Sequence, residues 1–533
     1  MADVTWNTQD NDGWQADFSA LRVLDTFNIS TDGNDRDANS TTLSPLDVGN
    51  RTWLRSPVTF AWVLPGLLDQ ARLITATERL IRTFPALTGR LDISATPLKI
   101  VTQGGSFPLS FAEWAVTSQC FEATNHWQGI YDSNQPYTTD AAWVDGLKVQ
   151  DAILGKAPLF TLRVTSLADN TTLLAAAFLH VLSDGKHMQR VISALSTSYR
   201  TQSADHLGRP VSRTLWPWHV QQQVPDLFTM EQKHRFGQET ARDALLHSQD
   251  GLTAGPARVN DDAVHEFVTL VCKPRSPQSE DRHWNAVLTV RLAQADLIAL
   301  KRTLQGGAAL QGVPFSTNDI CMALGWLMVC DAQSLPRPAQ GVAGSTRYIA
   351  TMYNLAIKGL ESLDPPGYLG NTAKSIMLSC KSDGSIEKEL DNPDSMLAAL
   401  ALTVKAVRKQ ILEWRQPQVV VDAITGLADL LPSAAYTSFV EQSAEHPRDG
   451  GFPTWVGAND PPVNFGSGPA LCQTGHMPIQ NILPGAIVKL LGGDTGIRLP
   501  VRSKAALQRL VDSPVLTVLA PNSGLLEGIL KGR

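Results

Sequence analysis

The strongest constraint on the fold is a short apolar run that stops at a histidine. Residues 173–179 read Leu-Leu-Ala-Ala-Ala-Phe-Leu, and the polar stretch His180-Val-Leu-Ser-Asp184-Gly185 follows directly. An apolar run of this length, closed by polar residues, is typical of a buried β-strand. His180 is therefore expected at the point where a strand leaves the core.

A helix is predicted directly after Gly185. Apolar residues recur there at spacings of three and four, which is one face of an amphipathic helix: Met188, Val191, Ile192, Leu195 and Tyr199. A turn between strand and helix presents a side chain from a rigid scaffold, and a neutral histidine accepts a proton near neutral pH. Asp184 is expected to hold the turn, by an ion pair with a buried arginine or by bonding N–H groups at the helix start. His187 is expected at a solvated helix position.

His180 also has a structural interpretation. A single histidine at a strand end is more often a satisfied structural residue than a catalyst, so H-x-x-x-D-G by itself does not identify an enzyme. Other stretches of the chain have to supply the remaining signal.

Six further stretches supply it through their order along the chain. They are LSPLD at 43–47, LIRTFPALTGRL at 80–91, FSTND from 315 with Ala323 and Trp326, PGYLGN at 366–371, Thr454-Trp455, and NFGSG at 464–468. Together with His180 to Gly185, they resemble the BAHD acyltransferases, and within that family the fungal trichothecene O-acetyltransferase type. The resemblance spans roughly residues 40 to 520.

The resemblance implies an α/β fold with two domains like chloramphenicol acetyltransferase, each a mixed sheet with flanking helices, joined by a long crossover. At 533 residues the chain is long enough for two cores. The expected parts are a polar N-terminal arm (1–40), an N-terminal acyltransferase domain with the H-x-x-x-D-G motif (41–207), the crossover (208–279) and a C-terminal acyltransferase domain (280–533).

The resemblance also assigns roles to residues. His180 would be the general base, with Asp184 and Gly185 supporting it. Thr454 and Trp455 would serve the oxyanion or the acceptor pocket. Contacts to the acyl-CoA are expected from Ser316, Thr317, Gly370 and Asn371. The structural motif would be Asn464, Phe465, Gly466 and Gly468. No covalent nucleophile and no metal site is implied.

Two residues depart from the family pattern DFGWG. Asn464 stands in place of the aspartate and Ser467 in place of the tryptophan. The family's aspartate commonly pairs with an arginine, and the nearest position for that arginine holds Ala356. Because both charges are missing together, Asn464→Asp alone is expected to destabilise the protein by burying an unpaired charge.

Composition and charge exclude several classes of protein. The net charge of −6 gives no case for nucleic acid or a membrane surface as partner. Six cysteines without a C-x-x-C pair indicate neither zinc nor a disulfide framework, and they fit free thiols in a reducing compartment. The start Met-Ala-Asp-Val-Thr-Trp lacks a signal pattern, so a cytoplasmic location is expected. The protein is also expected to be a monomer.

The expected function is transfer of an acyl group, most simply acetyl, from CoA to a hydroxyl, or second to an amine, of a small apolar secondary metabolite. Acyl-CoA would be a co-substrate, with no permanently bound cofactor. One alternative is a condensation-type domain that uses a carrier-protein thioester, although Leu179 stands where such domains carry a second histidine. The other is a non-catalytic binding protein, which the altered 464–468 stretch keeps open.

Overall fold

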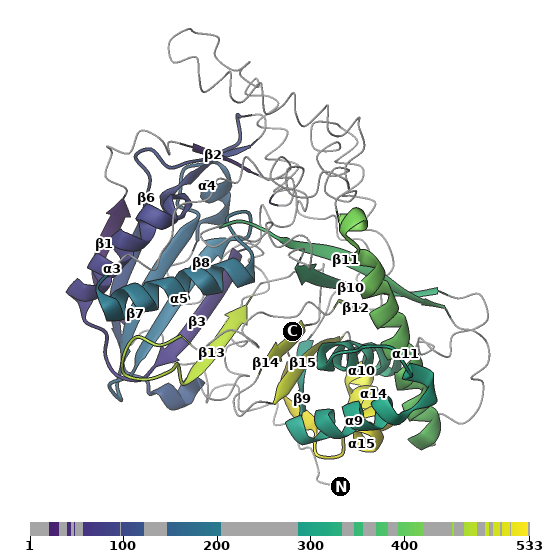
Figure 1. Ribbon diagram of the computed structural model, residues 1–533. Coiled ribbons are helices and arrows are strands. Elements are labelled where there is room, and N and C mark those ends of the chain that lie inside the picture. The colour runs from purple at the N-terminus through teal and green to yellow at the C-terminus, as the bar shows by residue number, and fades with distance from the viewer. Residues whose placement is uncertain are drawn as a thin grey trace, which may run out of the picture.

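The structure of the chain is a computed structural model. It describes residues 21–30, 40–43, 47, 57–95, 98–121, 147–203, 286–332, 346–354, 369–381, 393–420, 450–451, 463–476, 486–489, 494–501, 504–511 and 513–530. These residues form two lobes of sheet and helix that lie side by side (Figure 1). The predicted α/β class, with mixed sheets and flanking helices, is confirmed.

The first lobe is built on a six-stranded sheet with the predicted apolar strand inside it. All eight residues of β8 (Thr172–Leu179) are buried, and β8 pairs with β7 (Phe160–Leu167) and β3 (Pro57–Leu64). The turn from β7 to β8 uses Asn170 at φ 58°. The strand order is β1-β6-β7-β8-β3-β13, with β6 at Ser106–Trp114 and β13 at Cys472–His476. Only the β6–β7 pair in this sheet is parallel among the described residues.

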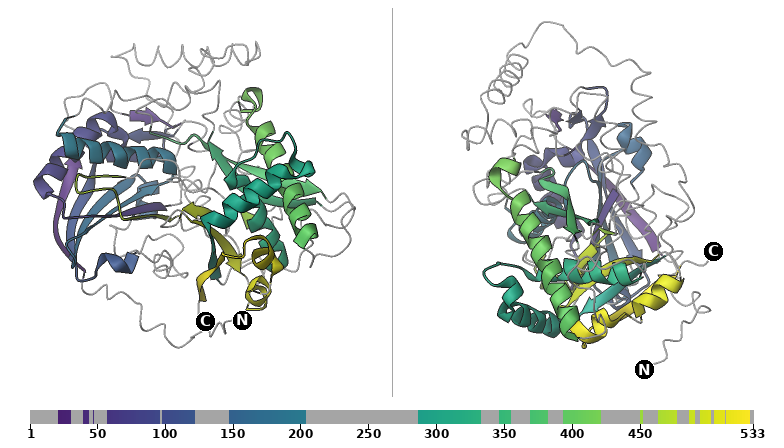
Figure 2. Two further views of the ribbon diagram at one scale, coloured as in Figure 1. Left: turned by 60° about the horizontal axis from the view of Figure 1, so that its bottom comes forward. Right: turned by 90° about the vertical axis from the view of Figure 1, so that its right-hand side faces the viewer.

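Two helices cover one face of this sheet (Figures 1 and 2). Helix α3 (Gln70–Thr83) begins at Gln70 because the Asp69 side chain caps it by accepting from the N–H of Arg72. Helix α5 (Gly185–Thr201) begins where predicted, with Asp184 as its cap. The short elements of this lobe are β2 (Ser40–Thr42), β4 (Arg90–Asp92), β5 (Lys99–Val101), η3 (Pro85–Thr88), η4 (Ser118–Phe121) and α4 (Val149–Ile153).

Part of the expected N-terminal arm is a strand. β1 (Leu21–Ser30) pairs with β6 along its length and forms the edge of the sheet. Its Phe27 ring meets Phe111 edge to face at 5.9 Å, and Ile29 is buried. The segment lacks the apolar periodicity of a buried strand, because an edge strand is solvated along much of its surface and Asp and Thr are tolerated there. These ten residues of the expected polar arm are therefore part of the first sheet.

The second lobe surrounds one apolar helix. Helix α10 (Thr317–Ala332) is buried without interruption from Asp319 to Cys330. Ser316 caps it: its hydroxyl accepts from the Asp319 N–H at 3.3 Å, and its N–H and hydroxyl donate to the Asp319 carboxylate at 2.6 and 2.8 Å. The sheets are β14-β15-β9-β16, at Ala486–Lys489, Thr495–Val501, Ala286–Leu292 and Gly524–Leu530, and β11-β10-β12, at Ala373–Lys381, Thr346–Asn354 and Gly450–Gly451. The other helices are α9 (Gln294–Gly306), η8 (Ala308–Leu310), α11 (Pro393–Trp414), α14 (Lys504–Val511) and α15 (Pro514–Leu519).

The two lobes have separate apolar cores, but the first core takes residues from the second half of the chain. Leu369, Val463 and Phe465 are buried among residues of the first lobe. Strand β13 also adds its backbone to the edge of β3. The domain boundaries stay a prediction, and the expected crossover at 208–279 lies outside the described residues. No helix among the described residues is long and apolar enough to cross a membrane.

The altered motif at 464–468 is a tight loop at the far end of α5. The Asn464 side chain accepts from the N–H of Gly466 at 2.7 Å, and the Phe465 ring meets Tyr199 of α5 edge to face at 5.4 Å. A carboxylate at 464 would accept the same hydrogen bond, and Asn464 is only partly buried. The expectation that Asn464→Asp buries an unpaired charge therefore loses its premise. Its proposed partner, Ala356, lies outside the described residues.

We expect Gly468→Ala to destabilise the protein by about 1–3 kcal/mol in urea denaturation, because φ at Gly468 is +132° and an added Cβ would meet Pro65 Cγ at 3.3 Å. Gly306→Ala is the matched control. It lies at the end of α9 with open space around its Cα, so it should be neutral or stabilising by up to about 1 kcal/mol. Equal effects of the two substitutions would contradict the strained loop.

Candidate active site

His180 lies on a turn that is held by hydrogen bonds within the turn and by a hydrogen bond from the second half of the chain. Within the turn, the N–H of Leu182 donates to the Leu179 carbonyl at 2.8 Å and that of Ser183 to the His180 carbonyl at 3.2 Å. From the second half of the chain, Asn371 Nδ2 donates to the same His180 carbonyl at 2.9 Å. His180 is only 3% exposed. The backbone that carries the predicted base is therefore held in a single arrangement.

Asn371 connects three distant parts of the sequence. Its backbone N–H and its Nδ2 donate to Asp47 Oδ1 at 2.8 and 2.9 Å, besides the bond to His180. The side-chain amide has one sensible orientation, because its oxygen would be repelled by the Asp47 carboxylate. Asp47 and Asn371 are both fully buried. Sequence reasoning treated Asp47 only as part of the 43–47 block and missed this contact, which a carboxylate inside an apolar block could have suggested.

Asp184 bonds an N–H at the start of α5, which is one of the two arrangements expected for it, and it has further partners. Its Oδ1 accepts from the N–H of His187 at 3.0 Å and bonds His187 Nδ1 at 2.8 Å, and its Oδ2 accepts from the N–H of Thr372 at 2.8 Å. The expected buried arginine is not among its partners in the described part of the chain. The prediction of a solvated His187 is wrong, since its side chain is 0% exposed. Three residues along a helix bring a side chain back over the cap, so His187 faces Asp184.

Burial has opposite outcomes for the two predicted site residues. It lowers the pKa of His180, and a hydrogen bond with its own backbone and the charge of Asp184 oppose the shift without reversing it. Burial by itself would raise the pKa of Asp184. The charge of His187, and the hydrogen bonds that the Asp184 carboxylate accepts from His187 and Thr372, hold that pKa well below its ordinary value. At neutral pH His180 is therefore a neutral imidazole beside an ionised Asp184.

The remaining predicted residues fall into three groups. Gly185, Gly370 and Asn371 meet at the turn, where the N–H of Asp184 donates to the Gly370 carbonyl at 3.1 Å. Ser316 and Thr317 begin α10, and the Ser316 hydroxyl is used in its cap. Thr454 and Trp455 lie outside the described residues. Asn371 has its Nδ2 occupied and, in the described part, only its Oδ1 without a hydrogen bond, so its contact to acyl-CoA stays a prediction.

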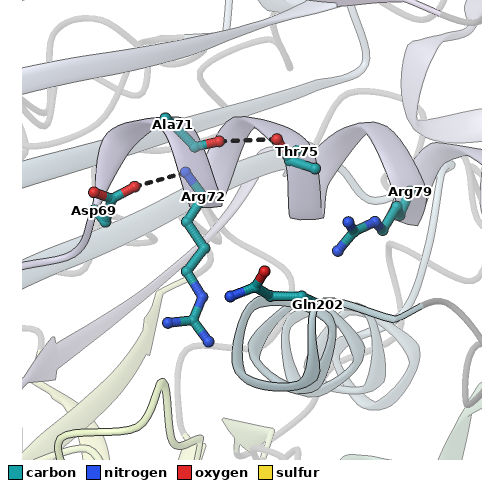
Figure 3. Close-up of a pocket in the computed structure, with 6 residues that line it drawn as sticks. All are labelled: Asp69, Ala71, Arg72, Thr75, Arg79 and Gln202. Carbon is teal, nitrogen blue, oxygen red and sulfur yellow. Dashed lines mark hydrogen bonds between the residues drawn. The ribbon is translucent and has the colours of Figure 1, made fainter.

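A surface cavity of about 440 Å³ lies at the opposite end of α5 (Figure 3). It is lined by Asp69, Ala71, Arg72, Thr75, Arg79 and Gln202. Arg72 donates from it to the carbonyls of Tyr199 and Arg200, which satisfies the last turn of α5. Because α5 has 17 residues, about 25 Å separates this cavity from the His180 turn. The cavity is therefore not part of the candidate active site.

Comparison with known proteins gives a result only at the level of structure. No family model matches the chain, and no curated protein sequence matches it. Vinorine synthase is similar with a TM-score of 0.55 and 14% identity over 92% of this chain and 96% of that one. F. sporotrichioides TRI101 complexed with coenzyme A and T-2 is similar with a TM-score of 0.57 and 14% identity, over 91% of this chain and 99% of that one. F. graminearum TRI101 complexed with coenzyme A and deoxynivalenol is similar with a TM-score of 0.56 and 13% identity, over 92% of this chain and 100% of that one.

These solved structures are BAHD acyltransferases, and they share their fold with this chain over more than nine tenths of its length. The fold expected from the resemblance of the sequence is therefore confirmed.

Removing the Asn371 side chain should loosen the turn that carries His180. Asn371→Ala leaves a buried carboxylate and a buried carbonyl each short of a donor, so we expect a loss of about 2–4 kcal/mol in urea denaturation. Asn522→Ala is the matched control, because Asn522 also bonds an aspartate, the buried Asp296, through both N–H and Nδ2. Asn522 itself is exposed, and the Ser523 hydroxyl still donates to Asp296 in the variant. Its cost should be below about 1 kcal/mol. A cost for Asn371→Ala no larger than that of the control would contradict the bracing role.

Proposed function

We propose that this protein is an acyl-CoA-dependent acyltransferase that moves an acyl group, most simply acetyl, to a hydroxyl of a small apolar secondary metabolite, with His180 as general base. The observation that carries the proposal is a neutral, buried His180 at the end of β8, braced from the second half through Asn371. The shared fold with acyltransferases supports it.

In the proposed reaction, a ring nitrogen of His180 takes the proton of the acceptor hydroxyl while the hydroxyl oxygen attacks the thioester carbonyl. The tetrahedral intermediate collapses, the C–S bond breaks, and His180 returns the proton to the departing CoA thiolate. The ester and free CoA are the products. Asp184 makes its described side-chain bonds with His187 and Thr372, so its proposed part is to hold the turn and not to relay a proton.

The proposal assigns the remaining roles by resemblance. Thr454 or the indole N–H of Trp455 would donate a hydrogen bond to the oxyanion. Thr317, Gly370 and Asn371 would contact the acyl-CoA. Ser316 is less suited to that role, because its hydroxyl is used in the cap of α10. Acyl-CoA is thus bound and released as a co-substrate in every turnover.

The acceptor class is proposed from two similar structures. TRI101 of F. graminearum and of F. sporotrichioides have been crystallised with coenzyme A together with T-2 or deoxynivalenol. We propose a hydroxyl of a comparably small molecule as acceptor, with an amine as second choice. A fungal source, a cytoplasmic location and a monomeric state belong to the same proposal.

The direct test measures CoA thiol release from acetyl-, malonyl- and longer acyl-CoAs with a mixed panel of hydroxyl acceptors. His180→Ala should lower turnover by about 10²–10⁴-fold while acyl-CoA still binds. Asn522→Ala, in the second lobe, should keep wild-type turnover.

Near-normal turnover of His180→Ala would refute His180 as the base. Binding of acyl-CoA without thiol release from any acceptor would favour the non-catalytic alternative. Release only from a carrier-protein thioester would favour the condensation-type alternative.

The pH profile gives an independent prediction. Because its pKa is lowered, His180 stays neutral, and so able to accept a proton, at pH values below about 6.5, the ordinary pKa of histidine. We therefore expect kcat/KM to persist as the pH falls through about 6.5 and to decline only below it. An acid limb centred above that value would contradict the assignment.

A further inference from the structure

His187 is a buried ionisable residue that the proposed reaction does not use. It lies in the first turn of α5, three residues after Asp184, and its side chain is 0% exposed. Its Nδ1 bonds Asp184 Oδ1 at 2.8 Å, and its backbone N–H donates to the same oxygen at 3.0 Å. One carboxylate oxygen is therefore devoted to His187.

The other oxygen of Asp184 holds the second half of the chain. Oδ2 accepts from the N–H of Thr372 at 2.8 Å, and the Thr372 hydroxyl lies at 3.3 Å. The preceding residue, Asn371, bonds the His180 carbonyl. A continuous path of hydrogen bonds thus runs from His187 through Asp184 and the 371–372 segment to the backbone of His180.

A buried carboxylate needs a counter-charge, and the described surroundings offer one. Residues 369–372 are Leu-Gly-Asn-Thr and carry no charge. The turn contributes His180, whose pKa is lowered, and across Asn371 lies the like-charged Asp47. On α5, Lys186 and Arg190 are half-buried, and neither forms an ion pair with Asp184 in the described part of the chain. His187 is the ion-pair partner that the carboxylate has there.

We propose that His187 is a positioning residue: as an imidazolium it balances Asp184, and through Asp184 it holds the segment that braces His180. The pair stands in the place of the ion pair with a buried arginine, which was one of the two arrangements expected for Asp184. Because a lone buried carboxylate takes up a proton, neutralising His187 would weaken the grip on Thr372 and free the turn. The catalytic consequence rests on the proposed function, whereas the ion pair does not.

The test compares melting temperatures of the full chain from about pH 5 to about pH 9 for wild type, His187→Asn and Lys186→Gln. Asparagine retains a neutral donor near the position of Nδ1. The Tm of His187→Asn should fall below wild type by about 5 °C or more near pH 7. The gap should narrow on the acid side, where Asp184 of the variant regains stability by taking up a proton that the unfolded chain does not bind.

Lys186→Gln removes a neighbouring positive charge without touching the carboxylate, so its Tm gap should be small and flat with pH. A His187→Asn gap that is constant from about pH 5 to about pH 9 would overturn the proposal, because packing alone gives no dependence of the gap on pH.

A double-mutant cycle keeps the proposal testable if one variant folds poorly. Asp184→Asn and His187→Asn each leave one charge unpaired, whereas the double variant leaves none, so it should lose less Tm than the two single losses added together. Strict additivity would overturn the ion pair. If acyl transfer is detected, kcat of His187→Asn should drop by about tenfold or more with KM little changed. An absence of transfer in wild type would count against the proposed function and leave the melting result standing.

Discussion

The arrangement of this protein depends on two buried carboxylates in the first lobe that receive donors from the second half of the chain. Asp47 accepts two N–H groups of Asn371, and Asp184 accepts the N–H of Thr372. A buried carboxylate without donors costs several kcal/mol, so the 371–372 segment cannot leave without a large penalty. The same segment holds the carbonyl of His180. The lobes are thus joined by hydrogen bonds at the point where the chemistry is proposed to occur.

Helix α5 connects the turn at His180 with the opposite end of the first lobe. Its first turn carries the Asp184–His187 pair, and its last turn contacts Arg72 and the 464–468 loop. The Arg72 guanidinium lies 4.6 Å from the centre of the Tyr199 ring while it also bonds backbone carbonyls. These contacts fix the helix at both ends, and α3 and the sheet hold it between them. The turn at His180 is therefore attached to a helix with little freedom to shift.

The departures from the family pattern fit a division between chemistry and packing. Asn464 and Ser467 alter a loop about 25 Å from His180, and the turn hydrogen bond that the loop needs is kept by the asparagine side chain. Close to His180, the Asp184 carboxylate bonds the Nδ1 and N–H of His187 and the N–H of Thr372. Both carboxylate oxygens of Asp184 thus have hydrogen-bond donors, whereas the distant loop has changed its composition.

The sequence by itself determined the elements around the site. The uncharged run at 173–179 had to be a buried strand, and the spacing from Met188 to Tyr199 had to be a helix, because apolar periodicity is a local property. The edge strand at 21–30 was not predicted from the sequence, because a solvated edge strand does not need apolar periodicity. Only the tertiary structure decided that His187 points inward, that Asp47 bonds Asn371, and that Thr372 meets Asp184. These contacts join residues up to 324 positions apart, and which buried donor meets which buried acceptor is set by packing and not by local sequence.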